Sequence, residues 1–414
     1  MHIERVEKAL KANLTWFQNS GIMDPADGSW GAAERIVITE NNEALEKIFY
    51  SFPAYSKYEK HAVIEHRRPD CNFQTALLFL LASHYFDEKK YADITDNILH
   101  YLHRRSGMRN TLFSEYPLNV WRWANEKWIP AIYFDDNGWN CILSIVIGRL
   151  SLELDKKYQL KNNALLLAGE LHSGFIHHFR NQTAGEKKTR WKGELESPHW
   201  GSVACMAFSY AYRETGHGAY RDTILRYHDY LAANLEKFTT SEQAYILLGS
   251  SIAAHFLEDR GVHEIAQRSA DTLVTAQDPR TGNIPSEWEK ETPSGSHLVD
   301  TIYTNNWAVL GLNIFCTLEK DPKIYQAYDK LVTLLLEIQD QAPDRIFNGC
   351  WRGMYDLEKK TWGGGDRFEG GANSIYSGWT NAPISIVLAC ILLDAGFTDL
   401  MNPLKGIAGS PRAE

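Results

Sequence analysis

The sequence predicts an all-α chain that forms one domain over residues 1–414, with six helical hairpins closed into an (α/α)6 toroid. Two observations predict this fold class. Roughly twelve helical segments alternate between amphipathic and almost wholly apolar ones, and no segment shows convincing strand alternation. Long polar loops precede the apolar segments, whereas short turns follow them. A ring of buried inner helices and half-exposed outer helices accounts for both patterns.

The amphipathic segments are the expected outer helices, and they begin near residues 3, 90, 158, 219, 262 and 321. In the first of them the side chains of Val6, Leu10 and Leu14 repeat at helical spacing and share one face. One apolar face allows a helix to cover a core while its other face meets water.

The apolar segments are the expected inner helices, and they begin near residues 70, 136, 199, 241, 301 and 376. Residues 137–154 are apolar on nearly every side, so this helix should be buried. Because consecutive elements are usually neighbours in space, the pairs should close into a ring whose inner helices all begin at the same end.

The loops before the inner helices carry aromatic and charged residues, as in 21–42, 113–133 and 342–371. The turns at the other end are short, as in residues 214–218. A structureless stretch of such length inside a compact domain is usually functional. We therefore expect a binding site at the mouth formed by the long loops. A short helix is expected within residues 43–55.

Two adjacent acids, Asp135 and Asp136, stand directly before an apolar helix that begins with Trp139. Either acid could simply cap the helix, because Asp accepts hydrogen bonds there and its charge suits the helix dipole. Asp70 has the same two interpretations. If both members of the pair face a substrate, their repulsion raises one apparent pKa and produces a proton donor. The predicted catalytic residues are Asp136, Asp135 and Asp70.

Indoles and polar side chains recur at the other inner helix starts and in the long loops. Indoles stack on sugar rings, imidazole and amide groups bond sugar hydroxyls, and arginines bind a uronate carboxylate through a bidentate fork. A carbohydrate is therefore the expected ligand, and the alternative is that two or three of the indoles only seal the barrel. The predicted substrate-binding residues are Trp30, Glu34, Arg35, Glu115, Trp139, His199, Trp200, Asn306, Trp307, Trp351, Arg352, Trp379 and Asn381.

This architecture resembles the six-hairpin glycosidases, a superfamily of (α/α)6 barrels, over nearly the whole chain. The Asp135-Asp136 pair is similar to the paired aspartates of the endo-α-1,6-mannanase family, although Asn137-Gly138 stands here where several aromatics usually follow. The unsaturated glucuronyl and rhamnogalacturonyl hydrolases are similar in layout, with an acidic residue at an inner helix start that Asp70 or Asp136 matches. The resemblance implies a glycosidase acting on an oligosaccharide.

Glycoside hydrolysis needs two carboxyl groups, one that donates a proton and one that acts as nucleophile or as base toward water. The separation of the two groups is not encoded in any local pattern. Loop carboxylates could supply the second group, and these are Glu34, Glu115, Glu194, Glu287, Asp366 and Glu369.

Three other functions stay open on the same toroid. A sugar epimerase would favour two histidines on different inner helices, and His199 is the only clear one at a helix start. A non-catalytic sugar-binding toroid would keep the indoles and tolerate loss of both aspartates. A polysaccharide lyase would use a base and groups that neutralise a carboxylate, for which the candidates are Tyr303, Asn305, His199 and Arg352.

Composition limits the kinds of binding partner and cofactor that we expect for this chain. A net charge of −9 argues against a nucleic-acid partner, and no apolar run is long enough to span a membrane. No cofactor or metal is expected: the six cysteines lack zinc spacing, and residues 363–365 lack the ending of a phosphate loop. Cysteines in apolar segments and an N-terminus unlike a signal peptide indicate a cytoplasmic protein. The oligomeric state is not predicted.

Overall fold

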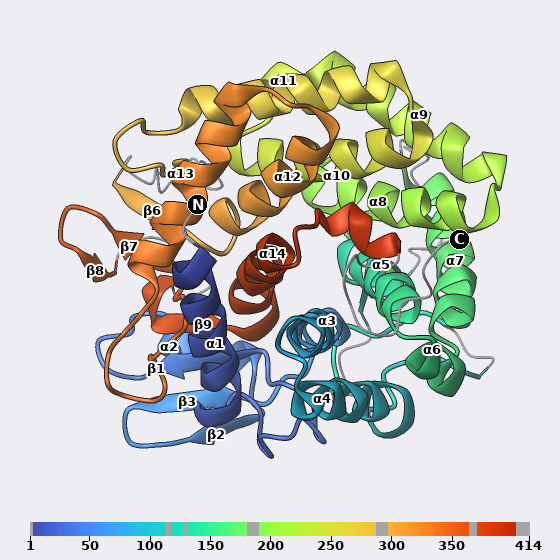
Figure 1. The fold of residues 1–414 in the computed structure, drawn as a ribbon. Coiled ribbons are helices and arrows are strands. Elements are labelled where there is room, and N and C mark those ends of the chain that lie inside the picture. The colour runs from blue at the N-terminus through green and yellow to red at the C-terminus, as the bar shows by residue number, and fades with distance from the viewer. Residues whose placement is uncertain are drawn as a thin grey trace.

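The computed structural model describes residues 3–112, 117–126, 131–179, 190–286, 297–363 and 371–402. Within these ranges six inner helices form a closed ring inside six outer helices (Figure 1), which confirms the predicted (α/α)6 toroid. The inner helices are α3 (Pro69–Phe86), α5 (Phe134–Leu150), α8 (Pro198–Thr215), α10 (Thr240–Leu257), α12 (Asn305–Leu318) and α14 (Ala382–Leu392).

Each inner helix packs against its two neighbours in the order α3, α5, α8, α10, α12, α14 and back to α3. Each also packs against one outer helix. Five hairpins follow the chain, but the sixth joins α14 to α1, so segments from opposite ends of the chain close the ring. The outer helices, in the order of their inner partners, are α4 (Lys89–His100), α7 (Leu160–His178), α9 (Gly218–Asn234), α11 (Arg260–Ala276), α13 (Pro322–Ile338) and α1 (Ile3–Asn19).

Small residues allow the inner helices to approach closely. A Cβ atom at Gly138 of α5 would lie 2.9 Å from the carbonyl oxygen of Val203 in α8. At Gly249 of α10 it would lie 3.0 Å from the Cβ of Ser202. Backbone packing at these distances leaves no room for a larger side chain, so the glycines set the spacing of the ring.

A 3-10 helix, η5 (Phe397–Met401), lies against α5 and α12 after the last inner helix. Its Phe397 is buried and donates its backbone N–H to Oδ1 of Asn313 in α12, at 3.1 Å. Gly396 lies against Thr317 in the last turn of α12. The segment therefore covers the end of the ring at which the inner helices finish.

The expectation that the chain contains no strands is wrong. A four-stranded antiparallel sheet has the order β2 (Tyr55–Lys57), β3 (His61–Ile64), β1 (Arg35–Ile38) and β9 (Ser374–Tyr376). Strand β1 lies inside the predicted loop 21–42 and pairs on its other edge with a segment more than three hundred residues away. The strands are two to four residues long, which is too short for alternation to be recognised.

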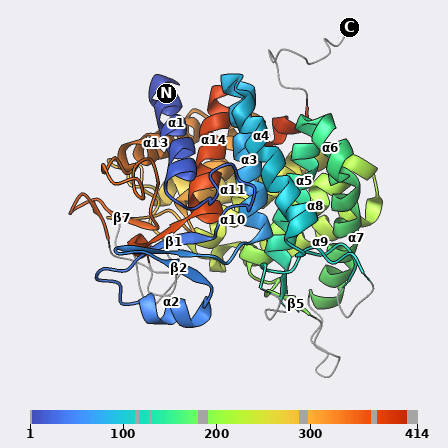
Figure 2. The ribbon, with the colours of Figure 1, turned by 90° about the horizontal axis from the view of Figure 1, so that it is seen from below.

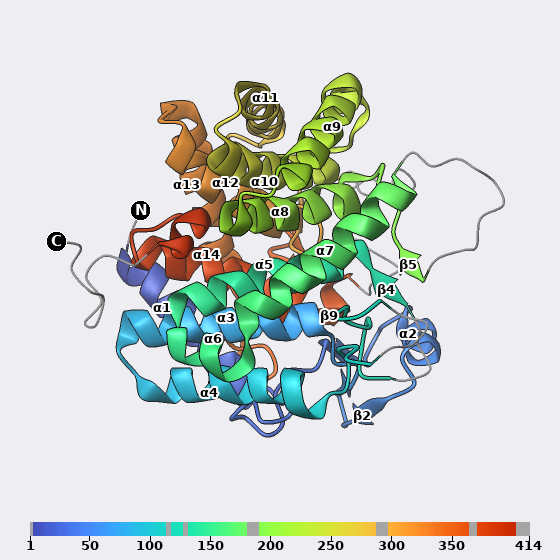
Figure 3. The same ribbon diagram turned by 90° about the vertical axis from the view of Figure 1, so that its right-hand side faces the viewer.

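The remaining strands also connect loops that are distant in sequence. Strands β4 (Ile132–Tyr133) and β5 (Trp191–Lys192) pair in parallel, and β6 (Leu298–Asp300), β7 (Met354–Asp356) and β8 (Thr361–Trp362) form a second antiparallel sheet. Figures 2 and 3 show the strands gathered at one end of the ring, away from the N-terminus of α1. The loops before the inner helices therefore form a continuous layer at that end.

Short helices complete the fold. Helix α2 (Leu45–Ser51) lies within the predicted range 43–55, and α6 (Leu152–Tyr158) joins α5 to α7. No helix in the described ranges combines the length and apolarity needed to cross a bilayer. All six cysteines are buried free thiols. The other short helices are η1 (Tyr101–Arg105), η2 (Leu235–Lys237), η3 (Gly371–Asn373) and η4 (Ser377–Asn381).

A glycine substitution tests the spacing of the ring. Gly138→Ala should lower the free energy of unfolding by about 1–3 kcal/mol, because the new methyl group meets a backbone oxygen that cannot rotate away. Gly169→Ala in α7 is the matched control, because its Cβ would meet nothing within 4 Å. That change should stabilise the protein by roughly 0.5–1 kcal/mol. Chemical denaturation measures both, and equal effects would contradict the packing described.

Candidate functional site

Side chains from the first two turns of five inner helices, and from η4 directly before the sixth, meet in one buried cluster. The rings of His199 and Trp379 lie 5.3 Å apart, and those of Tyr245 and Trp307 lie 5.7 Å apart. The bond from Nε1 of Trp379 to Oδ2 of Asp70 joins residues that are 309 positions apart in the chain. The contributing residues are Asp70 of α3, Asp135, Asp136 and Trp139 of α5, His199 of α8, Tyr245 of α10, Trp307 of α12 and Trp379 of η4.

Arg68 joins three carboxylates. Its Nε and NH2 donate to the two oxygens of Asp70 at 3.1 and 3.0 Å, and NH2 also donates to Oδ1 of Asp136 at 2.5 Å. Its NH1 donates to Oε1 of Glu34 at 3.3 Å. Because one nitrogen bonds both aspartates, the two bonded oxygens lie no more than about 5.5 Å apart. Burial opposes the charge of Arg68, but Asp136 and Asp70 hold its pKa well above the ordinary value.

Asp136 is a buried carboxyl with one oxygen unused. Its Oδ1 accepts from Arg68, whereas Oδ2 has no hydrogen-bond partner in the protein. Burial raises the pKa of Asp136 well above its ordinary 3.8; Arg68 opposes the shift, and the like charges of Asp70 and Asp135 add to it. A carboxyl group with a raised pKa and one oxygen unbonded by the protein has the properties of a proton donor.

Asp135 faces the other side of the cluster. Its Oδ2 lies 3.0 Å from Nε2 of His199, and its Oδ1 has no hydrogen-bond partner in the protein. Adjacent helical residues project about 100° apart, which explains why the two aspartates contact different groups. Burial raises the pKa of Tyr245, and the nearby charge of Asp135 adds to this effect. We call Arg68, Asp70, Asp135, Asp136 and His199 the acidic cluster.

Glu34, directly before strand β1, and Arg35, the first residue of β1, support the cluster. Burial opposes the charge of Glu34, but Arg35, His66 and Arg68 together lower its pKa below the ordinary value. Arg35 donates through Nε to Glu34 at 3.0 Å, and its guanidinium lies over the ring of Tyr376 at 4.6 Å. The guanidinium of Arg35 also donates to the hydroxyl of Tyr376, so its bonds to other groups of the protein do not support the predicted role in binding a uronate.

Most of the predicted stacking indoles fill the interior. Trp139 and Trp307 stack on each other at 5.3 Å and 23°. Trp351 is fully buried and donates through Nε1 to the carbonyl of Leu335 at 2.7 Å. Trp379 is 8% exposed and donates through Nε1 to Oδ2 of Asp70 at 3.0 Å. The last bond makes Trp379 part of the support of the carboxylates.

Two predicted indoles keep exposed surface. Trp200 is half-buried beside His199, with ring centroids 4.8 Å apart. Trp30 is 54% exposed and lines a separate hollow of about 590 Å³ together with Arg67 and Arg105. Trp200 is therefore the indole best placed to stack on a ligand at the acidic cluster, and Trp30 is not in contact with it.

The amide and arginine side chains that are predicted to bind substrate form hydrogen bonds with other groups of the protein. Asn306 donates to the carbonyl oxygens of Ile302 and Trp379 at 2.8 and 2.6 Å. Asn381 donates to the carbonyls of Trp351 and Tyr376 at 3.0 and 2.7 Å.

Arg352 pairs with Asp340, where two of its nitrogens lie 2.8 and 2.6 Å from one oxygen. Asn305, a proposed lyase residue, donates to the carbonyl of Asp300 at 2.9 Å. Two of the four proposed lyase residues, Arg352 and Asn305, are therefore bonded to other groups, whereas His199 lies in the acidic cluster. Glu194 is exposed, and the predicted residues Glu115, Glu287, Asp366 and Glu369 lie outside the described residues.

Sequence reasoning did not identify Arg68, Tyr245 or His66 as site residues. Arg68 precedes Asp70 by two positions, and a cation beside an acid at an inner helix start was the available signal. His66 lies two positions earlier, and its Nδ1 is 2.7 Å from Glu126. Tyr245 lies one turn inside an apolar helix, where nothing in the local sequence separates it from core aromatics.

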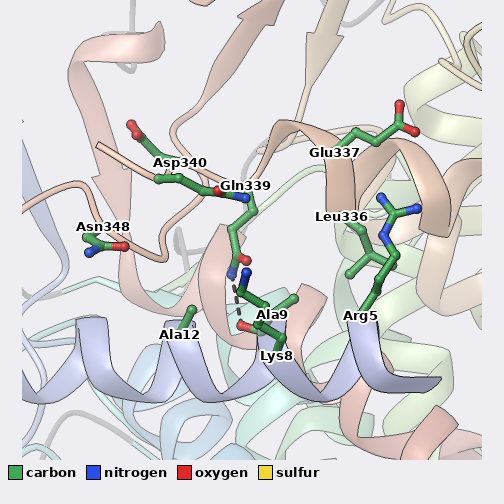
Figure 4. A pocket seen from close by; sticks show the side chains of 10 residues that line it. Arg5, Lys8, Ala9, Ala12, Leu336, Glu337, Gln339, Asp340 and Asn348 are labelled. Atoms are coloured by element: carbon green, nitrogen blue, oxygen red, sulfur yellow. Dashed lines mark hydrogen bonds between the residues drawn. The ribbon is translucent and has the colours of Figure 1, made fainter. Parts of the chain in front are cut away.

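Another hollow, of about 500 Å³, lies between α1 and the end of α13 (Figure 4). Its Gln339 already donates to the carbonyl oxygens of Ala9 and Gly349, at 2.9 and 3.0 Å. The satisfied amide indicates a surface depression between packed helices and not a second reactive centre. In the described part of the chain, no group of three His, Cys, Asp or Glu side chains is arranged to hold a metal ion.

Replacing Arg68 tests its role as the common counter-ion. Arg68→Met should cost about 3–5 kcal/mol of unfolding free energy at pH 8, because Asp70, Asp136 and Glu34 lose a buried cation. The loss should shrink as the pH falls toward the unfolded pKa of Asp, since protonation removes the uncompensated charge. Urea unfolding at pH 5 and pH 8 measures both effects.

The matched control is Arg268→Met, because Arg268 pairs with Glu236 at the surface, where the two side chains are 49% and 88% exposed. Its loss should cost about 1 kcal/mol or less, with little dependence on pH. Equal losses for the two arginine variants would show that Arg68 is not the common counter-ion of the buried carboxylates.

Comparison with known proteins finds similar chains among solved structures, but none among family models or curated proteins. No model of a known protein family matches the sequence, and no curated protein matches it. Among solved structures, an unsaturated glucuronyl hydrolase from Streptococcus agalactiae superposes with a TM-score of 0.58 at 16% identity, covering 95% of this chain and 92% of the other. Cellobiose 2-epimerase from Spirochaeta thermophila gives a TM-score of 0.61 at 12% identity, covering 94% and 97%.

A D-mannose isomerase is equally similar, with a TM-score of 0.61 at 11% identity over 94% of this chain and 96% of the other. The relatives therefore include a hydrolase, an epimerase and an isomerase, and all three are named for sugars. At these identities the likeness establishes the architecture. The chain has the (α/α)6 toroid fold that these structures share.

Proposed function

We propose that this chain is a glycoside hydrolase in which Asp136 donates a proton to the glycosidic oxygen. The observation that carries the proposal is the state of this one carboxyl group. Its pKa is raised well above 3.8, Arg68 fixes one of its oxygens, and the other has no hydrogen-bond partner in the protein. These are the requirements for a general acid that is held in place before the substrate arrives.

Asp135 is the proposed second carboxylate. One of its oxygens is held by His199 and the other has no hydrogen-bond partner in the protein. It would act as nucleophile or as base toward water. Asp70 is less suited to this role, because Arg68 occupies both of its oxygens and Trp379 bonds one of them. We assign Asp70 a positioning role.

In the proposed reaction Asp136, Asp135 and Arg68 have separate roles. Asp136 gives its proton to the oxygen of the leaving sugar as the bond from that oxygen to the anomeric carbon breaks. If Asp135 acts as a base, it takes a proton from the water that adds to the anomeric carbon, and that proton then passes through solvent to Asp136. If Asp135 acts as a nucleophile, it bonds the anomeric carbon, and the ionised Asp136 takes a proton from the water that displaces Asp135. The Arg68 guanidinium stabilises the negative charge that Asp136 acquires. Proton return to Asp136 completes the addition of water across the bond.

The structural relatives are consistent with this proposal. One of them is named a hydrolase of unsaturated glucuronyl groups. Two structures of that enzyme are of variants in which one aspartate is replaced by asparagine. The two replaced aspartates are about as far apart in its chain as Asp70 and Asp136 are in this one. An unsaturated or uronic oligosaccharide therefore belongs among the first substrates to test.

The second candidate is a sugar epimerase or isomerase, and the contact between His199 and Asp135 favours it. A carboxylate that orients an imidazole increases its strength as a base. His66, paired with Glu126 directly before α3, is a second buried histidine whose charge acts on Glu34. Several relatives are named as epimerases or isomerases. This reaction would depend on His199 more than on Asp136.

A substrate panel separates the two functions. The parent should release reducing ends from at least one neutral, uronic or unsaturated oligosaccharide. Asp136→Asn should lose activity on the order of a thousandfold, because the amide cannot donate the catalytic proton. Thermal unfolding should show that the variant is folded, since an amide oxygen can still accept from Arg68. If the parent instead interconverts monosaccharides and His199→Asn abolishes this, the hydrolase proposal is wrong.

The pH dependence gives a second test. Because Asp136 must be protonated to act, kcat should fall as the pH rises through its elevated pKa. The charge of Asp70 raises the pKa of Asp136, so Asp70→Asn should move this alkaline limb to lower pH. Steady-state rates from pH 4 to pH 9 measure both effects. A limb that stays in place or moves upward would contradict the proposed coupling between the two aspartates.

A further inference from the structure

Two buried amides beneath the acidic cluster have no hydrogen-bond partner. Gln74 of α3 is 2% exposed and Asn140 of α5 is fully buried. Neither the oxygen nor the nitrogen of either side chain is bonded by the protein. Other buried amides on the same helices are satisfied: Asn72 bonds the backbone of Ala32, and Asn137 bonds that of Trp121.

The helical register places both amides next to the acids. Gln74 follows Asp70 by four positions, and Asn140 follows Asp136 by four, so each amide lies on the same helix face as its acid, about one turn deeper. Arg68 bonds both acids, so these two faces converge. Side chains on a helix lean toward its N-terminus, and both amides therefore lean toward the acidic cluster.

An amide that is buried without partners costs free energy, because it gives up its bonds to water. Two such groups on adjacent inner helices, in register with the acids, form a polar surface with two acceptors and four donor hydrogens. Neighbouring hydroxyls of a sugar ring match this surface, since each hydroxyl both donates and accepts. A neutral amide gives no preference for a charged group.

We propose that Gln74 and Asn140 form the floor of the site and hydrogen-bond the hydroxyl groups of the sugar unit whose linkage Asp136 protonates. This assignment rests on the proposed function and deepens it. In this assignment the two amides determine which sugar binds, because they hydrogen-bond hydroxyls only in certain positions. The acidic cluster performs the reaction.

The test uses near-isosteric apolar variants, Gln74→Met and Asn140→Leu, in the Asp136→Asn background so that binding is measured without turnover. The probes are D-glucose, D-mannose and D-glucuronate, with saturation-transfer NMR and calorimetry as readouts. At least one probe should bind the background protein, and each variant should weaken that binding tenfold or more. Without sugar, both variants should melt at a higher temperature, because an unsatisfied polar group has been removed.

Tyr210→Phe is the matched control. The hydroxyl of Tyr210 in α8 is also buried without a hydrogen-bond partner, but its electrostatic neighbours are Cys390 and Asp399, near the covered end of the ring. This change should raise the melting temperature without altering sugar binding. A variant that melts higher and also binds sugar less tightly identifies a ligand-binding amide and not a packing defect.

The outcomes separate the two proposals. If a probe binds the two amide variants as tightly as the background protein, or if no probe binds at all, the floor assignment is wrong. Hydrolysis by the parent together with unchanged binding in the variants would reject the floor and leave the hydrolase. Sugar binding that depends on both amides, in a protein that hydrolyses nothing, would keep the floor and reject the hydrolase.

Discussion

The guanidinium of Arg68 is the contact on which the site depends. It holds carboxylates from α3, α5 and the loop before β1, and Trp379 brings the start of α14 to the same point. Removing several charges from water costs more than a single pair recovers unless each charge is bonded on several sides. The network therefore restricts the approach of the two inner helices and the loop to one geometry. The bonds that set the site geometry therefore also join α3, α5 and η4 at the helix starts.

The ring also concentrates helix ends. Six inner helices contribute their first turns to one region, and each N-terminus carries a partial positive charge. This field helps the cluster to hold several acids within a few ångströms of each other. The pKa of Asp136 is nevertheless raised, because burial and two neighbouring carboxylates outweigh Arg68. The pKa of Glu34 is lowered, so the network of Arg68 contains two acids whose pKa values are shifted in opposite directions.

Much of the architecture could be predicted because it follows from periodicity. Two kinds of helix, buried and half-buried, repeat six times, and only a closed ring buries one kind completely. The pairing of α1 with α14 could not be read from local pattern, because the two helices are far apart in the chain. The sheet around β1 was missed for a related reason. Its strands are four residues or shorter, and their pairing partners come from distant loops.

The same distinction applies to the site. Asp70, Asp135, Asp136, His199 and Trp379 were identifiable because each stands at the start of an inner helix. Whether an indole packs in the core or stacks on a substrate depends on the groups that face it in the folded protein. The sequence does not show these groups, so Trp139, Trp307 and Trp351 are predicted to bind substrate although they fill the interior. Gln74 and Asn140 were not recognisable, because a polar residue in an apolar helix becomes unusual only when its lack of partners is known.

The fold alone does not determine the reaction, because toroids of this kind include hydrolases, epimerases and isomerases. The central claim is that Asp136 keeps its proton where an ordinary aspartate has lost it. Difference infrared spectroscopy of the parent against Asp136→Asn, recorded during a pH titration, measures this directly through the carbonyl stretch of the protonated acid. The account predicts one carboxyl band that titrates well above pH 3.8 and is missing from the variant. A band for Asp136 that disappears at or below pH 3.8 would contradict it.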